Sequence, residues 1–183
     1  EYTKWLTSLD NLLGSINDNK IASLWILGGN PVYNVPANSK FSEAISKISH
    51  RIHLSGYRNE TSDLCSWHIP QSHFLESWGD ARTSDGTLVP VQPLIAPLFG
   101  GLCDLEFLAR LAGLNETSAN KIVRETFASV TGNSSEAAWN MFLHDGFAPD
   151  TAAKKVSGSF NASALTTALA GAASSVVSKD NLE

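Results

Sequence analysis

Residues 23–31, Ser-Leu-Trp-Ile-Leu-Gly-Gly-Asn-Pro, decide the fold predicted for this chain. The first five are uncharged and mostly apolar, as in a strand buried on both faces of a parallel sheet. Gly28 and Gly29 allow positive φ and close approach of another molecule, and Pro31 cannot continue a central strand. A strand, a glycine turn and a helix build the ligand crevice of open α/β folds. A plain strand-ending turn explains the same residues, so both interpretations stay open.

Length and composition bound the possible functions. The chain has 183 residues, of which 43% are hydrophobic and 17% charged, and its net charge is −5. A chain of this size buries roughly 70% of its unfolded surface, so its core needs no disulfide or metal. The absence of a basic cluster argues against nucleic acid as a partner, and no apolar run reaches the roughly 18 residues of a direct membrane span.

The cysteines and the first residue bear on the context of the chain. Cys65 and Cys103 permit at most one disulfide. Because the sequence has no Cys-x-x-Cys pair, this segment alone cannot hold an iron–sulfur cluster. The chain opens at Glu1, inside an expected helix. We therefore expect it to be a piece of a longer protein.

Hydrophobic periodicity predicts a three-layer, Rossmann-like open α/β fold with a C-terminal helical extension. Parallel core strands are expected at 21–27, 51–55 and 66–69, joined by right-handed crossovers and extended by an edge hairpin near 80–92 with an Asp-Gly turn. The expected helices are 2–18, 39–49 (with Asn38 as N-cap), a short one at 60–65, 103–113, 118–131, 134–144 and a weak one at 162–177. Residues 1–115 form the expected α/β domain, 116–150 its helical extension, and 151–183 an Ala/Ser-rich helix or linker toward a following domain.

Three kinds of chemistry can be weighed from side-chain spacing. Cys65, His68 and His73 lie within nine residues and could bind zinc, although a buried cysteine and hydrogen-bonded histidines explain them better. Cys65 with a histidine could form a catalytic dyad, but a lone cysteine on an apolar helix is usually part of a core. Carboxylates around the third strand could act as acid and base, but capping and turn roles explain them better: Glu60, Asp63, Glu76, Asp80 and Asp85.

Phosphate binding is favoured over these three. The Gly28-Gly29-Asn30 turn is neither the G-x-G-x-x-G fingerprint nor a P-loop. Its backbone amides can nevertheless meet a pyrophosphate beside a helix N-terminus. Glu60 and Thr61 follow the second strand, so parallel strands would bring them to the same sheet edge. The residues thus predict a crevice at 28–31 and 56–61 without naming its ligand.

Several segments resemble the molybdopterin oxidoreductase superfamily. Leu-Trp-Ile-Leu-Gly-Gly-Asn-Pro-Val at 24–32 resembles the Gly-x-Asn-Pro segment that opens the third domain of that family. That domain cradles one guanosine diphosphate arm of the bis-pterin cofactor. Four later pieces keep the family's order: Glu60-Thr61-Ser62 for Glu-Thr-Ala, Trp67–Pro70 for the Val-Val-Leu-Pro strand, Glu76–Gly79 for Glu-x-x-Gly, and Asp85-Gly86 for the Glu-Gly-Arg hairpin.

Three longer runs are similar to one branch, the iron–sulfur, molybdopterin-like B subunits of bacterial alternative complex III. These runs are 60–70, 75–82 and 91–98, and the similarity covers about residues 5–150. The resemblance implies a subunit of a respiratory quinol:acceptor oxidoreductase, on the periplasmic side of the bacterial inner membrane. It implies other domains and subunits as partners, and iron–sulfur clusters only in a separate ferredoxin-like domain.

The resemblance leaves two states of the cofactor site. In that branch the molybdopterin-like portion is thought to be a scaffold without cofactor. Here Gly-Tyr-Arg-Asn at 56–59 stands where cofactor-binding relatives place an Asp. The residues that match the cofactor motif either contact a molybdopterin guanine dinucleotide or are vestigial: Gly28, Gly29, Asn30, Pro31, Glu60 and Thr61. We therefore carry three hypotheses: a scaffold domain, a working half-site of a molybdoenzyme, and a stand-alone α/β nucleotide-binding or thiol enzyme.

Overall fold

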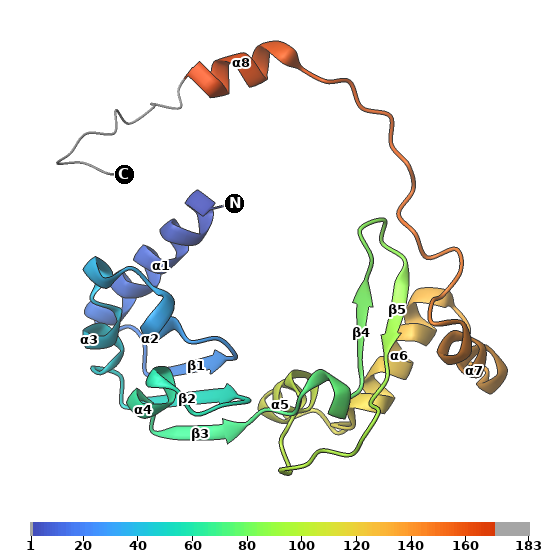
Figure 1. Cartoon of the computed structure of the whole chain (residues 1–183), viewed down its shortest axis with the longest axis horizontal. Coiled ribbons are helices and arrows are strands. Elements are labelled where there is room, and N and C mark those ends of the chain that lie inside the picture. The colour runs from blue at the N-terminus through green and yellow to red at the C-terminus, as the bar shows by residue number, and fades with distance from the viewer. Residues whose placement is uncertain (1, 171–183) are drawn as a thin grey trace. The chain divides into compact units, whose positions relative to one another are not determined.

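The computed structural model describes residues 2–170 (Figure 1). Backbone contacts divide the chain into two units, 1–152 and 153–183. Within the second unit, α8 (Ala162–Ala170) is an exposed helix, and the rest of the helix expected at 162–177 lies outside the described residues. The finer boundary expected at residue 115 stays a prediction.

A three-stranded parallel sheet organises the first half of the larger unit. Its strands are β1 (Ser23–Leu27), β2 (His50–Ser55) and β3 (Trp67–Pro70), in the order β1-β2-β3. Both pairs are parallel, and the register places Ile26 beside His53 and His53 beside His68. The predicted α/β fold with parallel core strands is thereby confirmed.

Helices on one side of this sheet form its main core. The helix α1 (Tyr2–Asn17) packs with α3 (Phe41–Ile45), and Leu24 of β1 lies against them. The amphipathic spacing of α1 explains this packing, because Leu9, Leu12, Leu13 and Ile16 share one helix face. The buried residues of this core are Leu13, Ile16, Phe41, Ala44, Ile45 and Ile48.

The helix expected at 39–49 is wrong in its start and length. The chain instead forms α2 (Pro31–Asn34), a 3-10 turn η1 (Ala37–Ser39) and α3. Pro31 occupies the first turn of α2, where its fixed φ suits a helix start. Asn38 lies inside η1, and the residue before α3 is Lys40, in the left-handed region at φ +53°.

The hairpin pairs as a sheet of its own. β4 (Gly79–Arg82) and β5 (Leu88–Val91) are antiparallel and form a separate two-stranded sheet. The hairpin was expected to extend the parallel sheet, and this detail is wrong. After β3 the chain pairs with the segment before α5 instead, through a Gln71–Leu102 bridge and a hydrogen bond from Leu102 N to Pro70 O.

A second core joins the hairpin to the later helices. These helices are α5 (Asp104–Leu111), α6 (Ala119–Thr131) and α7 (Glu136–Asp145). The core contains Leu88, Val123, Phe127, Trp139, Phe142 and Ala148. Gly146 follows α7 at φ +77°, in the left-handed conformation that ends a helix. Between the two halves, Phe107 of α5 lies 5.6 Å from Trp25 of β1, measured between ring centroids. Across the part of the chain that the structure describes, none of the helices has the length and apolarity needed to cross a bilayer.

Candidate functional site

A crevice lies at the carboxyl ends of the three parallel strands. It is a hollow of about 580 Å³, and the segments after β1, β2 and β3 line it. Such a position is where open α/β sheets bind their ligands. The lining residues are Gly28, Gly29, Ser55, Gly56, Tyr57, Gln71, Ser72, His73, Phe74, Glu76, Leu98 and Phe99.

A second hollow, of about 520 Å³, lies between the loop at 93–97 and parts of α5 and α6. None of the six residues that match the cofactor motif lines it. The crevice is therefore the candidate site, because its position and the sequence motif agree.

The glycine turn borders the crevice as the sequence predicts. Gly28 and Gly29 have φ values of +69° and +68°, which favour glycine. A Cβ atom built on either residue meets no atom closer than 3.9 Å. Gly28 N donates to Leu54 O of β2 over 2.7 Å, which ties the turn to the central strand. Backbone conformation, rather than crowding by protein atoms, is therefore what requires glycine here.

The structure brings the segments 28–31 and 60–61 together. Asn30 Nδ2 donates to Glu60 Oε2 over 2.6 Å, and Thr61 Oγ1 donates to Asn30 Oδ1 over 2.8 Å. Thr61 is fully buried, and its hydroxyl also accepts from Val32 N over 3.1 Å. The hydrogen bond from Asn30 lowers the pKa of the Glu60 carboxyl. Asn30, Glu60 and Thr61 therefore hold the turn, and their side chains do not line the crevice.

The start of α4 (Glu60–Leu64) fixes this arrangement. Asn59 is its N-cap, and its side chain accepts from Thr61 N and Ser62 N. Ser62 completes a capping box, because its hydroxyl accepts from Asn59 N over 3.2 Å. Such a box satisfies backbone donors that a helix start would leave free. The cap is not among the sequence-based predictions, although the Asn-x-x-Ser spacing at 59–62 is a signal for it.

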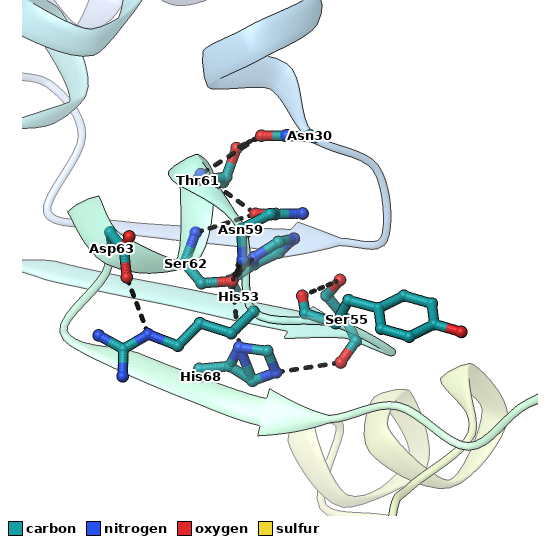
Figure 2. A network of polar contacts seen from close by, with 10 residues as sticks. Asn30, His53, Ser55, Asn59, Thr61, Ser62, Asp63 and His68 are labelled. Carbon is teal, nitrogen blue, oxygen red and sulfur yellow. Dashed lines mark hydrogen bonds and ion pairs between the residues drawn. The ribbon is translucent and has the colours of Figure 1, made fainter.

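A polar cluster behind the turn was not predicted. Figure 2 shows His53 of β2 and His68 of β3 reaching the Ser62 hydroxyl. The distances from Ser62 Oγ are 2.9 Å to His53 Nδ1 and 3.0 Å to His68 Nδ1. The other ring nitrogens, both Nε2, lie 3.2 Å from Gly29 O and 3.1 Å from Ser55 O, respectively. Burial lowers the pKa of His53, against an opposing effect of the Gly28 and Gly29 carbonyls.

The cysteine and histidines weighed for zinc are not brought together. His68 belongs to the cluster just described, and His73 Nδ1 accepts from Leu75 N at the start of the 3-10 turn η2 (Phe74–Glu76). Within residues 2–170, no group of three or more potential ligands could hold a metal ion. Burial raises the pKa of both the Cys65 and Cys103 thiols, which disfavours the nucleophilic thiolate.

Comparison with known proteins finds a distant similarity. No family model matches the chain. The chain is similar to the menaquinone reductase, molybdopterin-binding-like subunit of Nitratidesulfovibrio vulgaris, with 29% identity over 82 residues. The matched region covers 45% of this chain and 12% of that protein. This similarity supports a relationship to the molybdopterin oxidoreductases only at the level of the superfamily.

A pterin dinucleotide of that superfamily can be tested against the crevice. The open glycine turn suits close approach of a ligand to the backbone. The charges do not suit a diphosphate: among the described residues that line the crevice there is no Lys or Arg, whereas Glu76 adds a carboxylate. Arg58 lies nearby in sequence but pairs with Asp63 over 2.8 Å. The residues present therefore do not fit a molybdopterin guanine dinucleotide.

Guanine recognition fails the same test. In the cofactor-binding proteins that the chain resembles, an Asp after the second strand would be the carboxylate next to the base. The corresponding segment of this chain, 56–59, contains Tyr57 and no Asp. The neighbouring carboxylate, Glu60, is bonded to Asn30. What the crevice offers instead is aromatic surface, since Tyr57, Phe74 and Phe99 are 63–85% exposed. Exposed aromatic side chains of this kind are typical of surfaces that contact other proteins.

Proposed function

We propose that this chain is a scaffold domain of a molybdopterin oxidoreductase-like subunit in a respiratory complex that oxidises quinol, and that it performs no chemistry itself. The observation that carries the proposal is the engagement of Asn30, Glu60 and Thr61 with one another. These motif residues hold the crevice turn in place, while the crevice lacks the charges of a dinucleotide site. The motif thus keeps a structural role without a ligand.

The similarity to a menaquinone reductase subunit supports the choice of a quinone-linked complex. The resemblance to the B subunits of alternative complex III supports the more specific assignment to that complex. On this proposal the domain packs against other domains of its subunit and against further subunits, on the periplasmic side of the inner membrane. Iron–sulfur clusters would then be held by domains outside this chain.

Titration with guanosine diphosphate tests the cofactor part of the proposal. We expect no saturable change in the amide signals of 28–30 and 56–61, which corresponds to a Kd weaker than about 1 mM. Saturable micromolar binding at those amides would instead establish a working half-site. Molybdenum and pterin analysis of the whole subunit, purified from its native membrane, extends the test to sites shared between domains. Stoichiometric molybdenum there would contradict the scaffold role.

A variant with an added positive charge tests why the crevice would not bind a diphosphate. It distinguishes the lack of a cation from a backbone turn that no longer suits the ligand. Phe99 is 84% exposed at the crevice, so Phe99→Lys places a cation there with little effect on folding. Phe160→Lys is the matched control, since Phe160 is 78% exposed and belongs to the other unit. If charge is what the crevice lacks, Phe99→Lys gains weak diphosphate binding and Phe160→Lys does not.

The half-site remains the second candidate because one observation favours it. Both glycines of the turn keep positive φ and open space above their Cα atoms, as a ligand-facing turn requires. The stand-alone thiol enzyme has no comparable support, because burial raises the pKa of both cysteine thiols.

A further inference from the structure

Large apolar side chains gather on the loop between β5 and α5 (Figure 1) and beside the crevice. Residues 94–99 of this loop are all exposed to solvent. Six side chains, 49–85% exposed, form what we call the apolar patch: Tyr57, Phe74, Leu94, Ile95, Leu98 and Phe99. Single apolar residues are normal on a protein surface, whereas a group of this kind marks an interaction site.

Hydrogen bonds hold this loop against η2. Leu94 N donates to Leu75 O over 2.8 Å, and Leu98 N donates to Glu76 Oε1 over 3.3 Å. The second oxygen of this carboxylate, Oε2, accepts from His73 N over 3.1 Å. A surface that is ordered before its partner arrives loses less freedom on binding, so the loop is suited to recognition.

The apolar patch borders three hollows that share residues with one another. Leu98 and Phe99 line the crevice, and residues 93–97 line the second hollow. A third hollow, of about 310 Å³, shares Phe74 with the crevice and Trp78 with the second hollow. The patch and the hollows therefore form one continuous surface, which a single bound segment can cover.

The charged side chains of this surface are carboxylates. Among the described residues that line the three hollows there is no Lys or Arg. Four lining carboxylates take part in none of the ion pairs of the described chain: Glu76, Asp80, Asp104 and Glu106. His73 lines the crevice, but its Nδ1 accepts from Leu75 N, which only a neutral ring can do.

Basic residues that are close to this surface in sequence do not neutralise it. Arg58 and Lys121 form ion pairs of 2.8 and 2.9 Å with carboxylates that line none of the hollows. Arg110 lies one turn after Glu106 on α5, lines none of the hollows and forms no ion pair within the described residues. The surface thus combines apolar side chains with negative charge that no cation of this chain balances.

We propose that the apolar patch and the four carboxylates form a docking surface for a protein segment whose apolar side chains are bordered by lysine or arginine. The inference rests on the proposed scaffold role, which supplies other domains and subunits as partners, and it defines the chemistry of the one that binds here. Protein interfaces commonly have an apolar core and a polar rim. Opposite charges at such a rim attract the right partner, and like charges reject others.

The same charges disfavour two other occupants. In a two-fold contact between copies of this chain, both copies would present this surface, so carboxylates would face carboxylates. Anionic lipids make a membrane surface negative, and the carboxylates would be repelled from it. Neither occupant supplies the positive charge that the surface lacks.

Titration of the full chain with two synthetic peptides tests the charge requirement. Both peptides carry a face of leucines, which is bordered by lysines in one peptide and by glutamates in the other. We expect saturable shifts of the amide signals of 72–80 and 98–106 with the lysine peptide only. Binding of the glutamate peptide, binding of neither peptide, or shifts confined to other residues would overturn the proposal.

Substitutions separate the apolar and the charged contributions to that binding. Leu94→Ser combined with Phe99→Ser should weaken binding of the lysine peptide at least about tenfold. Asp80→Asn combined with Glu106→Gln should weaken it about threefold at low salt, and the difference should vanish at about 1 M salt, where screening acts within about 3 Å. Unchanged affinity in either double variant contradicts a joint surface.

Two control variants alter residues outside the surface. Leu114→Ser removes an apolar side chain that is 56% exposed, and Glu43→Gln removes an exposed carboxylate. Neither residue lines any of the three hollows, so both variants should bind the lysine peptide as the wild-type chain does. Sedimentation of the chain alone and with phosphatidylglycerol vesicles covers the other occupants. A dimer or vesicle binding that is lost on Leu94→Ser would replace the proposal.

Carboxylate labelling in the native complex shows whether a partner covers this surface there. Carbodiimide-driven coupling of glycine ethyl ester should modify Asp80 and Glu106 in the isolated chain and spare them in the complex purified from its membrane. Without the ester, the same reagent should link one of them to a lysine outside this chain. Equal labelling in both samples would overturn the docking surface and leave the scaffold role in place, whereas stoichiometric molybdenum with protected carboxylates would do the reverse.

Discussion

Asn30 and Glu60 are 30 residues apart in the sequence, and their side chains meet in a hydrogen bond of 2.6 Å from Nδ2 to Oε2. This contact joins the turn after β1 to the start of α4, which follows β2. It also occupies the carboxylate of Glu60, which by its sequence position alone could have contacted a ligand. The stability of the turn should therefore depend on the charge of Glu60.

Glu60→Gln removes that charge while keeping an oxygen that can accept from Asn30. Because the hydrogen bond lowers the folded pKa of Glu60, its charge contributes stability above the unfolded pKa of about 4.3. That contribution disappears as the pH falls through the folded pKa. Denaturant unfolding should show the wild-type protein to be more stable than Glu60→Gln at pH 7, with the difference shrinking as the pH falls below the unfolded pKa. Glu43→Gln, at an exposed position of α3, serves as the control; a difference for Glu60→Gln that persists in acid would contradict the charge explanation.

Thr61→Val tests the buried side of the same connection. Thr61 is fully buried, and its hydroxyl both donates to Asn30 Oδ1 and accepts from Val32 N. Valine keeps the shape but leaves Val32 N without this acceptor and removes one of the two hydrogen bonds that Asn30 Oδ1 accepts from Thr61, which costs about 1–3 kcal/mol of unfolding free energy. Urea unfolding measures this loss. Thr61→Ser keeps the hydroxyl and should retain the Asn30 contact, so an equal loss in both variants would mean that packing, not hydrogen bonding, decides.

Gly28→Ala examines whether the turn needs glycine for its backbone alone. The positive φ of Gly28 costs a residue with a Cβ about 1–2 kcal/mol. Gly132 after α6 is the matched control, because it has φ +70° and, like Gly28, no atom within 3.4 Å of a built Cβ. Unfolding free energies of the two alanine variants should fall by similar amounts. A much larger loss at Gly28 would point to a close contact that the turn does not have here.

Two features of the fold could be read from the sequence, because their signals are local. The apolar run before Gly28 predicted β1, and a helix-length connection predicted that β2 lies parallel to it. Parallel strands also bring their carboxyl ends to one edge, so the proximity of 28–31 and 60–61 followed. The breaking of the expected long helix into α2, η1 and α3 did not follow, because Pro31 can either end a strand or begin a helix.

The rest of the candidate site depends on side-chain direction and register. A carboxylate at position 60 could face a ligand or Asn30 with the same sequence spacing. The histidine cluster requires His53 and His68 to be paired across β2 and β3, and the sequence pattern does not fix that register. The hairpin was placed on the wrong sheet because the competing pairing, between Gln71 and Leu102, involves residues 31 apart without a strand-like pattern.

Gly101→Ala tests the close contact between the segment before α5 and the end of β3. A Cβ on Gly101 would lie 2.9 Å from Ser72 N, 3.0 Å from Gln71 C and 3.1 Å from Pro70 O. These are backbone atoms that cannot rotate away, so the segment before α5 must move off the end of β3. Forced displacement of this kind costs typically about 1–3 kcal/mol, and it should weaken the hydrogen bonds from Ser72 N to Leu102 O and from Leu102 N to Pro70 O.

Amide hydrogen exchange at Ser72 and Leu102, together with urea unfolding, measures both consequences. The matched control is Gly158→Ala, because Gly158 has open space around a built Cβ and no positive φ. We expect faster exchange and lower stability for Gly101→Ala alone. Since Gln71 and Ser72 also line the crevice, its neighbouring amide signals should shift in the same variant. Unchanged exchange at Ser72 and Leu102 would mean that the close approach of Gly101 does not hold the end of β3.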